Sequence, residues 1–169
     1  GLKISELVTL FNLEVLNRGS DYDTALLTIT DVNRPGLQFH SFYDYFDPRR
    51  LQVLGKAEIT YLGGLTAEQR RKCFDDLFLY DIPALVISRG LDCFPECLES
   101  ARVHERTLLR TEETTVEFTS HTIEYLNRVL APCVTRHGVL LDISGEGVMI
   151  TGDSGVGKSE SAIELIMRG

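Results

Sequence analysis

The sequence lacks a long hydrophobic run. Its apolar stretches, such as PALVIS at residues 83–88, are only a few residues long, whereas a helix needs ~20 apolar residues to cross a bilayer. We therefore expect no membrane-spanning helix. The first residues, GLKISELVTLF, contain neither a sustained apolar core nor a small-residue cleavage site, so they indicate a cytoplasmic protein without a signal peptide. Gly1 in place of Met indicates a trimmed or tag-derived end.

An excess of positive charge is also missing. The 17 lysine and arginine residues stand against 25 aspartate and glutamate residues, which gives a formal net charge of −8. Surfaces that coat nucleic acids carry clustered basic residues, because these residues contact the phosphates. The basic residues of this chain are scattered, so we expect no nucleic-acid partner.

Closely paired cysteines are scarce. Of Cys73, Cys93, Cys97 and Cys133, only Cys93 and Cys97 are near each other in the sequence, and a proline lies between them. A structural zinc site usually shows two closely spaced pairs. Reduced thiols in a reducing compartment are therefore the main interpretation, and a metal site is the alternative.

Strand and helix patterns alternate along the first 130 residues. Helical spacing or helix-start signals predict helices at residues 4–16, 65–81, 95–105 and 112–132. Short β-rich runs predict strands at residues 25–30, 51–55, 82–88 and 107–111. Asn33, Pro35 and Gly36 predict a loop at residues 31–38. The alternation predicts an α/β domain over residues 1–130, with a mostly parallel sheet and flanking helices.

The first predicted helix has one apolar face. Its members are Ile4, Leu7, Val8, Phe11 and Val15. In the later helices, Thr66 is a candidate N-cap and Pro95 occupies a favourable first-turn position.

The pattern changes after Pro132. Residues 133–143 and 146–152 read as two strands, joined by a Ser-Gly turn at 144–145. A loop and a helix at residues 160–168 follow. We predict a second domain over residues 133–169 that is incomplete, with two strands, one loop and one helix.

The loop of this second domain has the pattern of a phosphate-binding loop. Gly152, Gly157, Lys158 and Ser159 match G-x-x-x-x-G-K-[ST] between a predicted strand and a predicted helix. The glycines let backbone N–H groups approach phosphate, Lys158 neutralises its charge, and the Ser159 hydroxyl can bind Mg²⁺. The alternative is a glycine-rich turn before an ordinary capped helix.

Two further side chains precede this loop. His137 lies in an RHG turn before a strand, and pattern alone leaves it as either a structural residue or a catalyst. Asp142 ends a strand and could face either solvent or the phosphates.

Several stretches of the chain together resemble the HPr kinase/phosphorylase family. They are DVNRPGLQ (31–38), LQVLGKAE (51–58), YLG (61–63), IPALVISRG (82–90), LAP (130–132) and HGVLLDISGEGVMITGDSGVGKSE (137–160). The last is the most specific, because it combines the histidine, two strands and the phosphate-binding loop in one order.

The resemblance implies a bacterial enzyme that acts in the control of carbon metabolism and catabolite repression. It implies phosphorylation of a serine in the phosphocarrier protein HPr with ATP and Mg²⁺, and removal of that phosphate by phosphorolysis, which yields pyrophosphate. It also implies a homohexamer, with an amino-terminal domain similar to one in a peptidoglycan-precursor ligase and a carboxy-terminal P-loop kinase domain.

The resemblance assigns roles to particular residues. It implies catalytic roles for His137 and Lys158, and Mg²⁺ contacts for Ser159 and Glu160. The nucleotide loop is Gly152, Asp153, Ser154, Gly155, Val156, Gly157, Lys158 and Ser159. The family's catalytic aspartate and HPr-binding segments follow the last residue of this chain, so we expect the 169-residue chain alone to be inactive.

Two other functions stay open. One is a ligand-sensing or assembly module without catalysis, because residues 1–130 show no nucleophile–base pair. The other is a P-loop phosphotransferase that acts on a small molecule.

Overall fold

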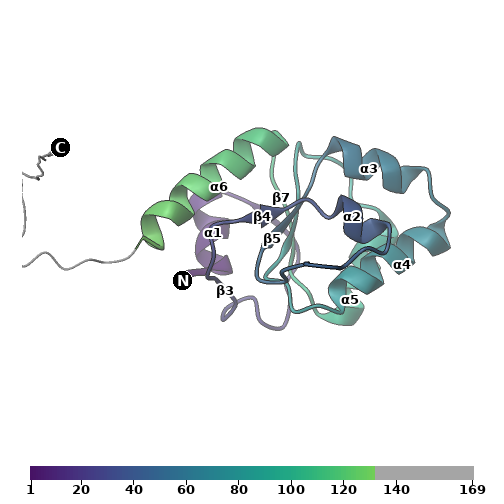
Figure 1. Ribbon diagram of the computed structural model, residues 1–169, viewed down its shortest axis with the longest axis horizontal. Coiled ribbons are helices and arrows are strands. Elements are labelled where there is room, and N and C mark those ends of the chain that lie inside the picture. Colours follow the sequence, from purple (N-terminus) through teal and green to yellow (C-terminus); the bar gives the residue numbers. More distant parts are fainter. Residues whose placement is uncertain (132–169) are drawn as a thin grey trace, which may run out of the picture. The chain divides into compact units, whose positions relative to one another are not determined.

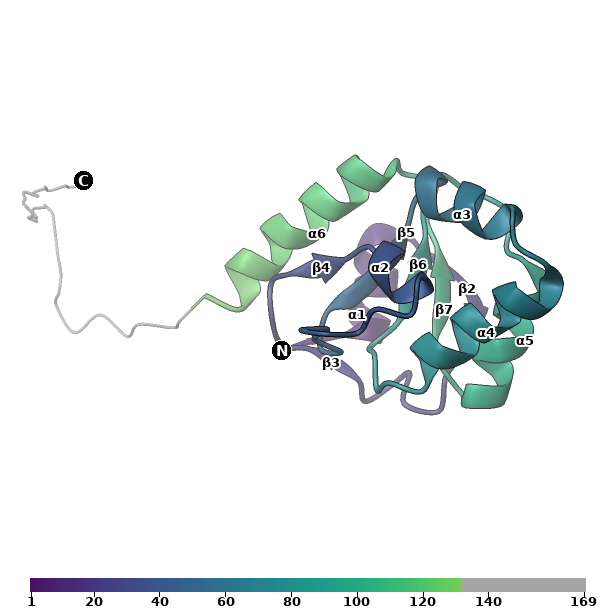
Figure 2. The same ribbon diagram turned by 45° about the vertical axis from the view of Figure 1, so that its right-hand side comes forward.

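Two neighbouring parallel strands, β5 (Leu51–Leu54) and β6 (Leu85–Ile87), lie at the centre of a five-stranded sheet (Figures 1 and 2). The computed structural model describes residues 1–131 of the chain. The strand order is β2-β7-β6-β5-β4, and β4 to β7 are parallel. Strand β2 pairs antiparallel with β7 at one edge. The remaining strands of this sheet are β2 (Glu14–Asn17), β4 (Val32–Asn33) and β7 (Leu108–Arg110).

Helices cover both faces of the sheet, as Figures 1 and 2 show. One apolar core joins α1 and α6 to the sheet through Val53, Val86 and Leu109. The other joins α2 to α5 to the opposite face. The helices are α1 (Ile4–Phe11), α2 (Gly36–Phe39), α3 (Lys56–Gly63), α4 (Ala67–Phe78), α5 (Pro95–His104) and α6 (Thr115–Val129). A separate two-stranded sheet pairs β1 (Leu2–Lys3) with β3 (Leu26–Leu27).

The α/β fold class predicted from the sequence is confirmed. The apolar run at 82–88 contains β6, whose residues are all buried, as expected for a parallel strand covered on both faces. Thr66 caps α4, because its Oγ1 accepts the backbone N–H of Gln69 at 3.1 Å. Pro95 occupies the first turn of α5. No helix within residues 1–131 is long and apolar enough to cross a membrane.

The first helix ends earlier than predicted. Asn12 follows Phe11 in a left-handed conformation, with φ 53°, and its backbone N–H donates to Val8 O. Asparagine adopts this conformation at lower cost than most residues, and it closes helices for that reason. Val15 therefore belongs to β2 and is 39% exposed, so its predicted place on the helical face was wrong.

The segment at 31–38, predicted to be a loop, contains β4 and the start of α2. Side-chain amides explain why polar residues form a strand here. Asn33 Nδ2 donates to Gln52 Oε1 at 2.7 Å and to Gln38 Oε1 at 3.1 Å. Gln52 is fully buried. The predicted strand at 25–30 shortens to β3, and α3 was not predicted.

A carboxylate links α4 to α5. Asp75 Oδ1 accepts hydrogen bonds from Ser100 Oγ at 2.6 Å, Arg71 Nε at 2.9 Å and His104 Nε2 at 3.2 Å. Burial raises the pKa of Asp75, but these donors outweigh burial, so its pKa lies below the ordinary value. Folding therefore favours the ionised form of the Asp75 carboxyl over the protonated form.

This pKa shift predicts a pH-dependent contribution to stability. Since the folded pKa is depressed, the contribution is present above the unfolded pKa of ~3.9 and is lost as pH falls through the folded pKa. We expect Asp75→Asn to lower the free energy of unfolding by about 1–2 kcal/mol at pH 7, a discounted value because the side chain is 35% exposed. Urea unfolding between pH 3 and 7 measures both effects. The exposed Asp23→Asn is the control, and an equal loss at pH 3 and pH 7 would contradict the assignment.

Candidate functional site

All residues of the predicted nucleotide site lie outside the described residues. This holds for His137, Asp142, the loop from Gly152 to Ser159, and Glu160. Their arrangement stays a prediction from the sequence. Within residues 1–131, polar side chains gather at one place that the sequence analysis did not single out.

That place is the carboxyl edge of the parallel sheet. Because parallel strands end on the same side, the residues after β5, β6 and β7 meet there, and ligands of open α/β sheets bind at such edges. Ser88 directly follows β6, and its Oγ donates to Leu54 O at 2.8 Å. The same hydroxyl lies 2.6 Å from Thr115 Oγ1 at the start of α6. Both side chains are buried and already hydrogen-bonded, so they bind the elements together and neither is an available nucleophile.

Gly55 allows two helices to begin close together at this edge. It follows β5, precedes α3, and is buried. An added Cβ would lie 2.6 Å from Thr115 Oγ1 and would also collide with the guanidinium of Arg34. Glu58 completes the arrangement, because its Oε1 accepts the Gly55 N–H at 2.7 Å and Arg34 Nη2 at 2.8 Å. The guanidinium of Arg34 is thereby held over the start of α3.

A strained turn follows β6 at the same edge. Arg89 has φ 60° and Gly90 has φ 59°, and a left-handed arginine is uncommon. Neighbouring chain segments hold the turn, because Arg89 N–H donates to Glu113 O at 2.7 Å and Gly90 N–H to Thr111 O at 2.8 Å. The Arg89 side chain is exposed and forms no ion pair within residues 1–131. Arg89 is thus a cationic side chain at this edge without an ion-pair partner within residues 1–131, whereas Arg34 is paired with Glu58 and the carboxylate of Glu112 lies beside Gly90.

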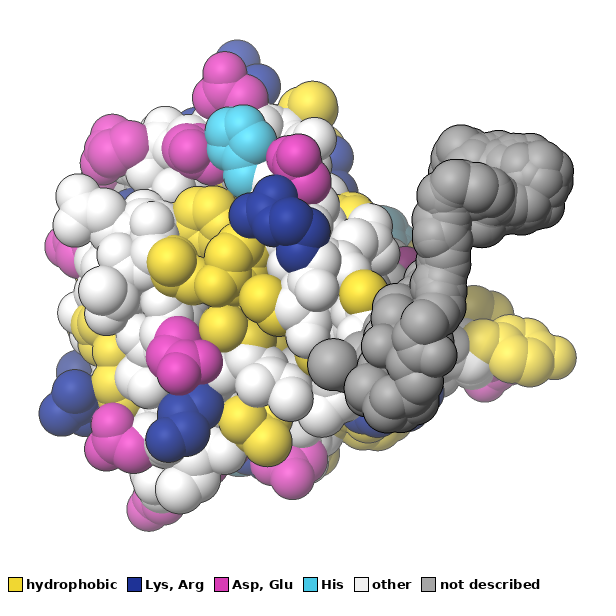
Figure 3. Space-filling view, turned by 90° about the vertical axis from the view of Figure 1, so that its left-hand side faces the viewer, with side chains coloured by type: hydrophobic (Ala, Val, Ile, Leu, Met, Phe, Trp, Pro, Cys, Tyr) yellow, Lys and Arg dark blue, Asp and Glu magenta, His cyan; other side chains and the backbone are white. Residues whose placement is uncertain are grey.

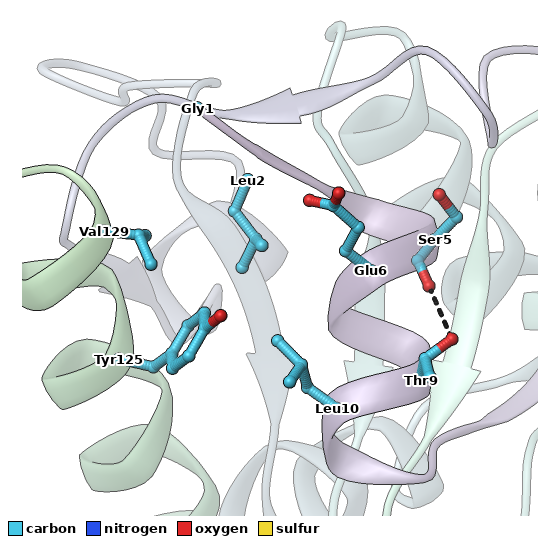
Figure 4. A pocket seen from close by; sticks show the side chains of 8 residues that line it. All are labelled: Gly1, Leu2, Ser5, Glu6, Thr9, Leu10, Tyr125 and Val129. Carbon is cyan, nitrogen blue, oxygen red and sulfur yellow. Dashed lines mark hydrogen bonds between the residues drawn. The ribbon is translucent and has the colours of Figure 1, made fainter.

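A hollow lies on another side of the domain, between α1 and α6 (Figure 4). It has a volume of about 600 Å³ and apolar walls formed by Leu2, Leu10, Tyr125 and Val129. Thr9 Oγ1 donates to Ser5 O within α1 at 3.2 Å. Figure 3 looks onto this side of the molecule and shows apolar side chains gathered in the middle of the face, with charged side chains around them. The hollow has the character of a contact surface and offers no pair of groups for acid–base chemistry.

The described residues offer no metal centre. Within residues 1–131, no three cysteine, histidine, aspartate or glutamate side chains are placed to hold a metal ion. Cys93 and Cys97 supply two thiols only, and Cys133 lies outside the described residues.

A signal for the carboxyl edge was present in the sequence. Three of the predicted strands end in a glycine or a polar residue, namely Gly55, Ser88 and Thr111, and polar residues or glycine follow the last two. The pairing of Arg34 with Glu58 gave no such signal, because 24 residues separate them.

Two family models together match nearly the whole chain. A model described as the HPr serine kinase N terminus matches residues 2–126. A model described as the HPr serine kinase C-terminal domain matches residues 128–169.

Curated relatives agree with these matches. The chain is 45% identical over 168 residues to the HPr kinase/phosphorylase of Alkaliphilus metalliredigens, covering 99% of this chain and 54% of the relative. It is 45% identical over 169 residues to the HPr kinase/phosphorylase of Clostridium beijerinckii, covering 100% of this chain and 55% of the relative. The chain thus spans about half the length of the curated relatives it matches.

Among solved structures, the chain is similar to the CBS and DRTGG domains of the regulatory region of a Clostridium perfringens pyrophosphatase, complexed with the activator diadenosine tetraphosphate. The TM-score is 0.49 at 15% identity, over 72% of this chain and 45% of that one. A likeness of this size carries no argument about function.

The close packing of Thr115 and Arg34 against Gly55 predicts that an added methyl group at this position destabilises the fold. We expect Gly55→Ala to lower the free energy of unfolding by about 1–3 kcal/mol, because the Cβ would displace Thr115 or Arg34. Gly36→Ala is the matched control, because its Cβ would meet no atom within 4 Å. Urea denaturation of both variants measures the difference, and equal stabilities would contradict the described packing.

Proposed function

The chain belongs to the HPr kinase/phosphorylase family, and on this premise we propose that the whole protein uses ATP to phosphorylate a serine of HPr. We further propose that it removes this phosphate by phosphorolysis, with release of pyrophosphate. HPr as partner, a homohexameric assembly and a cytoplasmic location are parts of the same proposal. The observation that supports it is the phosphate-binding sequence GDSGVGKS at residues 152–159, set within a chain that matches both family models.

The chemistry of these residues suits the γ-phosphoryl group of ATP. Phosphoryl transfer needs positioning and charge neutralisation, since little covalent chemistry is left to the protein. In this proposal the backbone N–H groups of the loop bind the phosphate oxygens, and the Lys158 ammonium neutralises their charge. His137 orients the attacking oxygen, which belongs to the HPr serine in one direction and to inorganic phosphate in the other.

The donor set near Lys158 also fits Mg²⁺. Ser159 offers a hydroxyl and Glu160 a carboxylate, and magnesium prefers such oxygen ligands. When bound, the ion neutralises charge on the phosphates. Ser159 and Glu160 place these two oxygen ligands directly after Lys158 in the sequence.

A second function is proposed for the amino-terminal domain, as a ligand-sensing module. Arg89, which directly follows Ser88 at the carboxyl edge of the sheet, favours it. Arg89 is exposed, has no carboxylate partner within residues 1–131, and sits on a strained turn of the kind that often lies at binding sites. A phosphorylated small molecule is the class of ligand that this guanidinium would bind. Without such a ligand, the module would serve assembly alone.

The kinase proposal predicts that Lys158 is essential. In the full-length enzyme we expect Lys158→Ala to reduce serine phosphorylation of HPr by ATP and Mg²⁺ by roughly 100-fold or more, because phosphate charge is no longer neutralised. Incorporation of labelled phosphate into HPr is the measurement. Lys72→Ala is the matched control, because Lys72 is an exposed lysine of α4.

Two results would contradict this proposal in different ways. A fully active Lys158→Ala enzyme would show that Lys158 and its loop take no part in the reaction. An intact enzyme that leaves HPr unmodified but phosphorylates a metabolite would identify a small-molecule phosphotransferase instead.

The sensing proposal predicts a binding site that does not need the phosphate-binding loop. We expect sugar phosphates or nucleotides to release heat on titration into the Lys158→Ala chain, and Arg89→Gln to weaken that binding roughly 10- to 100-fold. Glutamine keeps the backbone strain at position 89 comparable, so the loss reports the charge. Arg102→Gln, in an exposed arginine of α5, is the control. Unchanged affinity in Arg89→Gln, or no heat with any ligand, would refute sensing at this edge.

A further inference from the structure

The loop between α2 and β5, at residues 40–50, is rich in aromatic side chains. Four of its eleven residues are phenylalanine or tyrosine, namely Phe42, Tyr43, Tyr45 and Phe46. Two of these rings hold the loop against the end of α4. The Tyr43 ring stacks on Tyr80 with ring centres 4.9 Å apart, and the Phe46 ring meets Tyr80 edge to face at 5.0 Å. The loop is therefore anchored at two points.

The other aromatic residues of the loop face solvent. Tyr45 is 99% exposed, so its ring gains almost nothing from the domain that carries it. Phe42 and Leu37 are also exposed, and they are neighbours, because the backbone N–H of Phe42 donates to Leu37 O at 3.0 Å. Together with Tyr80 these residues form an exposed apolar surface, the aromatic patch. Exposed apolar patches, and aromatic side chains in particular, are typical of contact surfaces between proteins.

The backbone of Tyr45 is also unfavourable for a tyrosine. The N–H of Phe46 donates to Tyr43 O at 3.0 Å, which closes a turn with Asp44 and Tyr45 at its tip. Tyr45 is the third residue of this turn and has φ 63°, a conformation that glycine or asparagine usually supplies at this position. Backbone strain of this kind is concentrated at functional sites. A tyrosine at this tip is explained when a partner contacts its ring.

Charges of both signs flank the aromatic patch. Asp44 is exposed and forms no ion pair within residues 1–131. Asp47 is neutralised within its own chain, because Arg49 donates to its carboxylate at 3.0 and 2.8 Å. Arg50 approaches only Asp31, at 3.9 Å, and its buried Nε has no hydrogen-bond partner among the described residues. The loop thus has an unpaired acid before Asp47 and a weakly paired base after it.

We propose that this loop is a contact surface for a second copy of the chain, related to the first by a twofold axis near Asp47. The inference rests on the proposed self-association and names the residues of one contact. In a twofold contact the two loops run antiparallel. Asp44 and Arg50 are equally far from Asp47 in the sequence, so Asp44 of each copy approaches Arg50 of the other.

The charges favour a second copy over another kind of partner. A partner surface of a single sign would be repelled by either Asp44 or Arg50, whereas a second copy offers the opposite charge to both. The two Asp47 carboxylates near the axis tolerate each other, because each is neutralised by its own Arg49. The exposed rings of the two aromatic patches then bury one another, which removes apolar surface from water.

Photo-cross-linking of the full-length enzyme tests this contact. A benzophenone amino acid replaces Tyr45, and the irradiated protein is cleaved with trypsin. Cleavage after Arg18 and Arg49 places the loop in the peptide 19–49, since the bond between Arg34 and Pro35 resists trypsin. We expect two copies of this peptide linked to each other. Each chain contains the peptide once, so such a link joins two chains.

Charge reversal tests the pairing of the two loops. Asp44→Arg alone and Arg50→Asp alone should each lower the yield of covalent dimer on a denaturing gel about tenfold, because like charges then face each other. Co-expression of the two variants should restore the yield, since the mixed pair again joins opposite charges. Asp23→Arg, at an exposed acid outside the loop, is the control and should leave the yield unchanged. Circular dichroism of each variant checks that the fold is kept.

The outcomes that overturn the proposal are distinct from one another. If native mass shows an oligomer but the peptide 19–49 is never linked to itself, the copies associate through another surface. If native mass shows a monomer, the proposed self-association fails as well. A yield that ignores the charges of residues 44 and 50 would refute the antiparallel pairing. None of these results bears on the proposed kinase activity, which is measured by labelled phosphate in HPr.

Discussion

The burial of β5 and β6 on both faces is the constraint on which the rest of this domain depends. A parallel strand pair with apolar side chains on both faces is stable only when helices cover both faces. Two cores result, one under α1 and α6 and the other under α2 to α5. The parallel direction also brings the strand ends to one edge, so the polar residues after them become neighbours. The layered packing and the polar carboxyl edge therefore have the same origin.

Charged side chains fix α3, α4 and α5 relative to one another. Arg70 of α4 donates to Leu62 O at 2.9 Å and to Leu65 O at 3.0 Å, where α3 ends, and to Glu96 of α5 at 2.9 Å. Its guanidinium also lies 4.6 Å from the centre of the Phe94 ring. The start of α5 is thus held from α4 by an ion pair and a cation–π contact. Phe94 and Glu96 are therefore the residues through which α4 contacts the start of α5 at this point.

Local signals in the sequence were sufficient for part of this structure. The capping residue Thr66, the helix-starting Pro95 and the apolar run that contains β6 act through their nearest neighbours, and each was predicted. Val15 was misplaced because four-residue spacing fits a helix until Asn12 ends it. The polar strand β4 and the ion pair of Arg34 with Glu58 depend on partners distant in the sequence, and a single sequence does not give them. The nucleotide loop is predicted from its sequence motif alone, because its residues lie beyond Ala131, the last residue that the structure describes.

The amides of Asn33, Gln38 and Gln52 carry a consequence for how the chain finds its native pairing. Strand β4 is two residues long, so backbone hydrogen bonds alone distinguish weakly between its correct register on β5 and a slipped one. A slip by one residue would turn Asn33 to the other face and leave the buried Gln52 amide without its donor, at a cost of ~1–3 kcal/mol. The buried polar side chains thus select the correct register of β4 on β5, because a slipped register would leave them without hydrogen-bond partners. Apolar side chains alone would tolerate such a slip.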